Sequence, residues 1–158
     1  MITPSKSRSK RKQDEMGRIV VDIALANHED VILSNAGLLA PEKIRRVTIP
    51  GVVDTGATLL SLPARLVRQL GLTKRSTKRV RNTTGTHDVD VYGTVRLTIA
   101  GRDCPTDVIE VPDDTPVLIG QIPLEYLDFV VDLRNHRLIG NPEHGGEHMF
   151  ELYLNETR

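Results

Sequence analysis

The sequence predicts an all-β domain, and three observations support that prediction. Short apolar segments that alternate with polar residues recur along the chain, separated by clusters of Gly, Pro, Asn and Asp. Only two stretches have helical character, and both are short. The chain has 158 residues, of which 39% are hydrophobic and 27% charged. This size and composition fit one globular domain with its own core.

The first strands lead into a polar turn. Apolar residues alternate from Ile19 to Leu25, as is typical of a half-buried strand. A turn cluster opens the segment from Asn27 to Ala40, whose remaining structure the pattern leaves open. Val47 to Ile49 resumes extended structure, and Pro50-Gly51 interrupts it before Val52-Val53. The pattern therefore predicts a strand, a kink and a second short strand.

A short amphipathic helix is predicted next. Leucines recur four residues apart from Leu62 to Leu70. Ser61 is suited to cap the start of this helix, Pro63 is tolerated in a first turn, and Gly71 favours a C-terminal stop.

The longest strand signal runs from Val89 to Ile99, with Gly93 interrupting its apolar face as at a bulge or a close backbone approach. Val80-Arg81 precedes it, so the two segments should form a projecting hairpin whose polar tip spans Asn82 to Thr86. A second short helix is predicted at Pro123 to Leu127. Further strands are predicted at Asp107 to Val111, Val117 to Ile119, Phe129 to Leu133, Arg137 to Ile139 and, at the end of the chain, Met149 to Leu154.

The stretch Val52-Val53-Asp54-Thr55-Gly56-Ala57-Thr58 is the strongest candidate for chemistry. Two β-branched residues favour a packed strand, and that strand delivers the Asp54 carboxylate to a turn. Thr55 bonds readily to backbone groups, and Gly56 tolerates turn conformations closed to other residues. An Asp-Thr-Gly turn after a strand is often purely structural, so a catalytic role for Asp54 needs support from other motifs in the chain.

Three features occur in one order: the Asp54-Thr55-Gly56-Ala57 turn, the hairpin with its Thr84-Gly85-Thr86 tip, and Leu118-Ile119-Gly120 before a short helix. In this combination the sequence resembles the retropepsin-like aspartic proteases, and is most similar to their small bacterial members. The resemblance implies a small closed β-barrel with a flap hairpin and one or two short helices. It covers residues 17–142, with a basic, disordered tail at 1–15 and a C-terminal extension at 143–158 that could add a strand to a dimer interface.

The resemblance also implies roles for these residues. Asp54 is the catalytic carboxylate, and Thr55, Gly56 and Ala57 complete the active-site loop, in which Thr55 bonds to the matching loop of a partner chain. Thr84, Gly85 and Thr86 form the flap tip over the substrate. Leu118, Ile119 and Gly120 support the site as the second motif.

The chain departs from the family pattern at two positions. Retroviral members carry an acid two residues after the motif glycine and an Arg after the glycine of the second motif, and these two side chains pair. This chain has Thr58 and Gln121 there. Losing both partners together leaves neither charge unpaired.

An aspartic protease needs two carboxylates that share a proton, and this chain has one such motif. Asp132 lacks a following Thr-Gly, and Asp88 and Asp90 lie in the hairpin. The sequence therefore predicts a homodimeric aspartic endopeptidase that acts on peptides or proteins, with Asp54 from each chain and no metal or organic cofactor. The alternative is an inactive domain of this fold that serves as a binding or dimerisation module.

His144 and His148 suggest a rival chemistry, since two histidines four residues apart can bind zinc on a helix. Gly145 and Gly146 lie between them and disfavour a helix, so we expect a polar loop.

Charge and cysteine content narrow the partners and the compartment. The 21 basic and 21 acidic residues balance, so no overall field favours nucleic acid or a membrane. The basic residues of the tail could dock nucleic acid, but no aromatic residue accompanies them for stacking. Cys104 is the single cysteine, and no apolar stretch resembles a signal peptide or a membrane span. A cytoplasmic location is the expectation.

Overall fold

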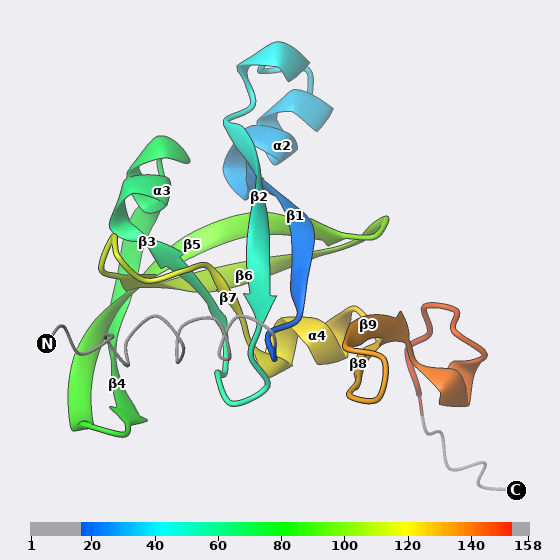
Figure 1. Cartoon of the computed structure of the whole chain (residues 1–158). Helices are drawn as coiled ribbons and strands as arrows, with labels where there is room; N and C mark the ends of the chain where they lie inside the picture. Colours follow the sequence, from blue (N-terminus) through cyan, green and yellow to red (C-terminus); the bar gives the residue numbers. More distant parts are fainter. Residues whose placement is uncertain (1–16, 153–158) are drawn as a thin grey trace, which may run out of the picture.

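A computed structural model describes residues 17–152. The predicted tail at 1–15 and the last six residues, 153–158, lie outside the described residues. Figure 1 shows the arrangement of the elements. In chain order these are β1 (Val20–Asn27), α2 (His28–Asn35), η1 (Pro41–Lys43), β2 (Arg46–Val53), β3 (Leu60–Pro63), α3 (Ala64–Gln69), β4 (Thr73–Asn82), β5 (Gly85–Ile99), β6 (Arg102–Val111), β7 (Leu118–Ile119), α4 (Gln121–Tyr126), β8 (Phe129–Asp132), β9 (Arg137–Gly140) and η2 (Pro142–His144).

Strands dominate the molecule, which confirms the predicted all-β class. Seven strands form one sheet in the order β1-β2-β7-β3-β6-β5-β4, and a further pairing of β1 with β5 brings the sheet back on itself as a ring. β4 pairs only with β5 and projects from this ring as a hairpin. In Figure 1 the hairpin reaches toward the end of the molecule where the loop after β2 lies. β8 and β9 form a separate two-stranded sheet.

The core fills the ring with the alternating residues that the sequence indicates. Along β5 every second residue from Val91 to Ile99 is buried, and Gly93 lies where the pairing with β6 shifts register, which confirms the predicted bulge. Among the described residues, the largest fully buried side chains include Ile23, Leu25, Leu60, Leu62, Leu66, Leu97, Ile119 and Leu127. The site described below is thus built on well-packed strands.

The structure corrects the prediction at the segment after β1, where a turn was expected and helix α2 forms. The side chain of Asn27 caps the helix by accepting a hydrogen bond from the amide of Asp30 at 3.1 Å. Glu29 and Asp30 lie in the first turn, where the helix dipole favours acids. Asp30 also binds the Arg45 guanidinium at 2.9 Å, which ties the helix to the start of β2.

The predicted kink at Pro50-Gly51 is wrong, because β2 runs through both residues as one strand. Pro50 pairs with Asp22 and Gly51 with Val21 on β1. A Cβ on Gly51 would lie 2.9 Å from the side chain of Ile119 on β7. The glycine therefore allows close packing between strands instead of ending one.

The helix expected from Leu62 begins later than predicted. Leu60–Pro63 forms β3, and Ser61 lies within that strand instead of capping a helix. The carboxylate of Asp113 accepts a hydrogen bond from the amide of Arg65 at 2.8 Å and so takes the capping role. Gly71 ends the helical segment at φ +62°, a conformation that favours glycine.

The predicted C-terminal strand is not formed by Met149 to Leu152, which contain no strand. This segment instead lies beside the turn between α4 and β8, where the amide of Met149 donates to the Asp128 carboxylate at 3.1 Å. Within residues 17–152, no helix is long and apolar enough to cross a membrane.

Candidate active site

Asp54 lies at the end of β2, where a parallel neighbour fixes the backbone. Val52 pairs with Leu118 and Val53 with Ile119 on β7. The amide of Asp54 donates to the Ile119 carbonyl at 2.9 Å. The two motifs that the sequence singled out are therefore adjacent strands, and the second one holds the backbone of the first.

The loop after Asp54 closes on the carboxylate itself. Its Oδ1 accepts a hydrogen bond from the amide of Gly56 at 3.0 Å, and the amide of Ala57 donates to the Asp54 carbonyl at 3.1 Å. Thr55 and Gly56 are exposed at the outside of this loop. A Cβ on Gly56 would lie 3.2 Å from Oδ1, so glycine keeps the approach to the carboxylate open.

Gly120 lets α4 pack against the loop from the other side. A Cβ there would lie 2.4 Å from the Leu59 carbonyl oxygen and 2.7 Å from that of Ala57. Past this glycine, the amides of Gln121 and Ile122 donate to the carbonyls of Ala57 and Thr58 at 2.8 and 3.0 Å. The first turn of α4 thus stabilises the active-site loop through two backbone hydrogen bonds.

A cleft of about 880 Å³ opens between Asp54 and the hairpin. Asp54, Gly56, Ala57 and Thr58 contribute to one side, and the strands of the hairpin form a wall that the β6 end completes. This volume lies within the range of small-molecule and peptide-side-chain sites. The remaining lining residues are Ser61, Arg79, Val80, Arg81, Asn82, His87, Val89, Ile109, Glu110, Val111, Pro112 and Thr115.

The hairpin is present, but its tip does not line the cleft. Asn82 pairs with Gly85 across a two-residue turn, and the Asn82 side chain accepts hydrogen bonds from the amide and the hydroxyl of Thr84 at 2.9 and 2.7 Å. Thr84 to Thr86, predicted as the flap tip, are exposed at its end. Asn82 and His87, on either side of that tip, reach the cleft instead.

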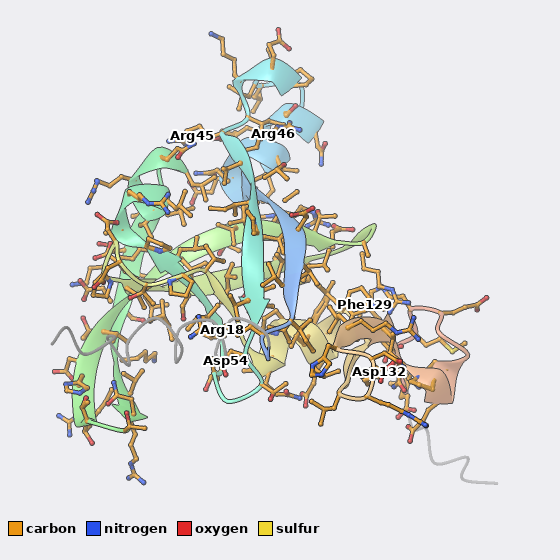
Figure 2. The ribbon with its side chains drawn as sticks, in the orientation of Figure 1. Arg18, Arg45, Arg46, Asp54, Phe129 and Asp132 are labelled. Carbon is orange, nitrogen blue, oxygen red and sulfur yellow. The ribbon has the colours of Figure 1, made fainter. Side chains whose placement is uncertain are left out.

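Other aspartates that the sequence offered as partners for Asp54 are engaged elsewhere. Asp132 binds Asn135 Nδ2 at 2.8 Å and Arg137 Nε at 3.1 Å, and these hydrogen bonds lower the pKa of its carboxyl. Figure 2 shows Asp132 on β8, apart from Asp54 at the end of β2. Asp88 and Asp90 pair with Arg79 and Lys74 within the hairpin. Among the described residues, the other carboxylate that lines the cleft is Glu110.

Sequence reasoning missed the charged residues of the cleft wall. Arg79, Arg81 and His87 line it from the hairpin. Arg18 was missed too: it precedes Ile19, whose carbonyl accepts from the amide of Val53 at 2.8 Å, so it lies beside the Asp54 loop (Figure 2). Only the strand pairing reveals these positions, because their spacing from Asp54 in the sequence carries no signal.

The two histidines considered for zinc bind different partners. His144 bonds to the carboxylates of Asp128 and Glu151, and His148 Nε2 bonds to the Tyr126 carbonyl at 3.0 Å. Within the part of the chain that the structure describes, no group of three or more potential ligands is arranged for a metal. The segment is a turn built around Asp128.

Burial makes Cys104 an unreactive thiol. Its side chain is buried in the core, and that burial raises its pKa to about 11. A thiolate is the reactive form of cysteine, so this residue offers no nucleophile near neutral pH.

Comparison with known proteins agrees with the site. Residues 40–122, slightly more than half of the chain, match a family described as aspartyl protease. The match includes the Asp54 loop, the hairpin and the second motif. No curated protein matches the chain significantly. With its single Asp-Thr-Gly loop supported by the Leu118-Ile119-Gly120 strand, this chain belongs to the aspartyl protease family.

Proposed function

We propose that the protein is an aspartic endopeptidase that works as a homodimer, with one Asp54 from each chain. The observation that carries this proposal is the position of Asp54 in a cleft whose lining, within residues 17–152, includes no second aspartate. Acid–base hydrolysis of a peptide bond by this chemistry needs two carboxylates. Glu110, the other carboxylate of the lining, is not followed by Thr-Gly. A second copy related by a two-fold axis supplies a second carboxylate on a matching Asp-Thr-Gly loop.

The exposed loop supports this assembly. Thr55 and Gly56 lie on the surface, and neither packs into the core of its own chain. A two-fold axis passing beside this loop brings the two Asp54 carboxylates together, and Thr55 then bonds to the partner's loop. The backbone bonds from Ile119, Gln121 and Ile122 hold the loop in one shape, so little ordering is required on association.

The protonation of the two Asp54 carboxylates follows from their proximity in the proposed dimer. Two facing carboxylates cannot both ionise easily, so one stays protonated. The ionised Asp54 removes a proton from the attacking water, while the protonated one donates to the carbonyl oxygen of the scissile bond. In the tetrahedral gem-diol, the carboxyl that took the water's proton gives it to the leaving nitrogen and the C–N bond breaks. A hydroxyl of the diol gives its proton to the pair as the product carboxyl forms, so the pair is again singly protonated.

The test is incubation with a peptide library at several pH values, with and without a statine-type mimic of the tetrahedral intermediate. We expect cleavage in mild acid, inhibition by the mimic and no cleavage by Asp54→Asn. Absence of cleavage by a confirmed dimer across the pH range would reject the proposal.

The second candidate is a domain of this fold that binds or dimerises without hydrolysis. The observation that favours it is the replacement of the family's ion pair. Gln121 Nε2 bonds to Glu125 Oε1 at 2.8 Å within α4, and Thr58 is exposed in the cleft. Peptide binding without cleavage, measured by calorimetry on the wild-type dimer, would support this candidate over the protease.

A further inference from the structure

The wall of the cleft formed by the hairpin carries positive charge. Arg79 and Arg81 on β4 line it together with His87 on β5. Residues two apart on a strand point to the same side and lie about 6.6 Å apart, close to the spacing of alternate side chains of an extended peptide. Val80 and His87 pair across the hairpin and line the cleft from one face of it, so Arg79 and Arg81 border the cleft from the other face of β4.

The two arginines differ in how their charge is compensated. Arg79 lies directly opposite Asp88, and the two side chains approach to 3.6 Å. Arg81 lies opposite Thr86, which offers no charge. Within residues 17–152 no carboxylate lies within ion-pair distance of Arg81. Its guanidinium is thus available to a ligand.

The acids of the cleft do not cancel this charge. Asp54 belongs to the proposed reacting pair, which shares a proton. Burial raises the pKa of Tyr92, and the charge of Glu110 adds to that effect. The bond to Asp90 raises the pKa of Lys74, with Glu110 as the smallest of the contributions. Lys74 in turn bonds to Asp90 at 3.0 Å. Among the described residues, Glu110 forms no ion pair with Arg81, because the salt bridges include neither side chain.

We propose that Arg81 gives the cleft a preference for peptides that carry Asp or Glu near the scissile bond. This inference rests on the proposed protease function. A guanidinium binds a carboxylate through two parallel hydrogen bonds, which fix direction as well as charge. Closure of the hairpin over a bound peptide removes water and strengthens that contact.

The experiment uses pairs of quenched peptides that differ only by Glu or Gln at one position on either side of the bond that the wild-type protein cleaves. The quantity measured is the ratio of kcat/KM for the Glu peptide to that for the Gln peptide. For at least one position we expect a ratio of roughly 1.5 to 5 at low salt, as for one partly exposed ion pair. The ratio should fall toward one at high salt, because the ions screen the pair.

Three variants separate the role of Arg81 from a general charge effect. Arg81→Gln should bring the ratio close to one, and Arg81→Lys should retain part of it. Lys78→Gln is the matched control, because Lys78 lies exposed on the same strand, carries the same charge and does not line the cleft. It should leave the ratio unchanged.

The outcomes distinguish the two proposals. A wild-type protein that cleaves peptides with ratios near one at all positions overturns the preference and leaves the protease function standing. A preference that survives in Arg81→Gln, or that disappears equally in Lys78→Gln, overturns the role of Arg81. If the wild-type dimer cleaves no peptide at all, the protease function falls and this inference falls with it.

Discussion

Two aspartates, Asp54 and Asp128, each follow an apolar segment, but their carboxylates differ in burial and in the number of hydrogen bonds they accept. Asp128 is buried, and its carboxylate accepts hydrogen bonds from Asn141 Nδ2, His144 Nδ1 and the amide of Met149 at 3.1, 2.6 and 3.1 Å. Asp54 accepts one such bond, from Gly56, and faces the cleft. A carboxylate that is fully bonded holds structure together, whereas one that keeps free lone pairs beside a cavity is available for chemistry.

The same contrast appears in the surrounding backbone. The loop of Asp54 is held by several main-chain bonds from β7 and α4, and the carboxylate adds one more bond, from the amide of Gly56. The turn around Asp128 relies on its side chain at three points, because Asn141, His144 and Met149 all bond to that carboxylate. Arg102 and His148 add bonds to the carbonyls of Gly146 and Tyr126. Changing Asp54 should therefore affect activity alone, and changing Asp128 should affect folding.

The largest expected effect comes from Asp54→Asn. The amide cannot act as a base or share the proton, so peptide cleavage should fall by at least about 1,000-fold. The melting temperature should stay close to wild type, because the backbone bonds of the loop remain. Asp132→Asn is the matched control and should keep the activity. Cleavage by Asp54→Asn above the background of a mock preparation would falsify its assignment.

Gly120→Ala should damage the same site through packing. The added Cβ meets two backbone carbonyls, which cannot move aside as a flexible side chain can. We expect a loss of roughly 1 to 3 kcal/mol in the free energy of unfolding, together with loss of activity. Denaturant titration checks the first and peptide cleavage the second. Gly17→Ala, where a Cβ meets nothing within 4 Å, is the control; a neutral Gly120→Ala would contradict the packing described for α4.

Asp128→Asn tests the structural role of the second aspartate. The amide keeps one acceptor oxygen but loses the charge that pairs with His144, so the contacts of His144 and Met149 with this side chain should weaken. Hydrogen exchange at the amide of Met149 should then become faster, while cleavage per folded dimer stays near wild type. Unchanged protection of Met149 would show that Asp128 does not anchor the segment.

The contribution of Asp128 and His144 to the stability of the fold should depend on pH, with a smaller effect than the substitutions above. Bonding to His144 and to the Met149 amide, against opposing burial, lowers the pKa of Asp128 from 3.8 to about 2. Bonds to Glu151 and Asp128 raise the pKa of His144 above its ordinary value of 6.5. The acid therefore stabilises the fold above about pH 4, and this contribution is lost as pH falls toward 2.

The histidine stabilises it below pH 6.5, and this contribution is lost as pH rises through its raised pKa. Arg102 faces the same turn, where its guanidinium donates to the Asp128 carbonyl at 2.9 Å, and it stays charged throughout. The melting temperature, measured from pH 2 to 9, should therefore fall at the acid end, as Asp128 is protonated, and at the alkaline end, as His144 loses its proton. His144→Gln should flatten the alkaline limb, and an unchanged alkaline limb in that variant would assign it to another group.

Much of this architecture could be predicted from the residue pattern, because period-two alternation and the turn residues report which face of a strand is buried. The strands around Ile23, Leu97 and Ile119 follow from such local signals, whereas the link between the two motifs was implied by the family resemblance. The helix after Asn27 and the unbroken β2 strand did not, since both depend on tertiary partners: Arg45 for the helix, and Ile119 against Gly51 for the strand.

In the candidate site too, some residues could be predicted from local sequence signals and others could not. Asp54 and Gly120 have motif neighbours that identify them, whereas Arg81 and Glu110 reach the cleft only through the fold of the hairpin and β6. The anchoring role of Asp128 was equally hidden, because its partners lie 13 to 21 residues away in the sequence. Contacts between single polar residues far apart in the chain produce no periodic pattern in the sequence from which they could be predicted.

The central claim is that each chain holds half of the catalytic pair, and a joint titration of assembly and activity tests it most directly. Sedimentation and peptide cleavage should be measured over the same grid of protein concentration and pH. We predict that activity per mole follows the dimer fraction and is lost reversibly on dilution. The rate should be bell-shaped with a maximum in mild acid, since the singly protonated pair is the active form. A strictly monomeric protein with full activity, or a rate that climbs steadily into alkaline pH, would contradict the account.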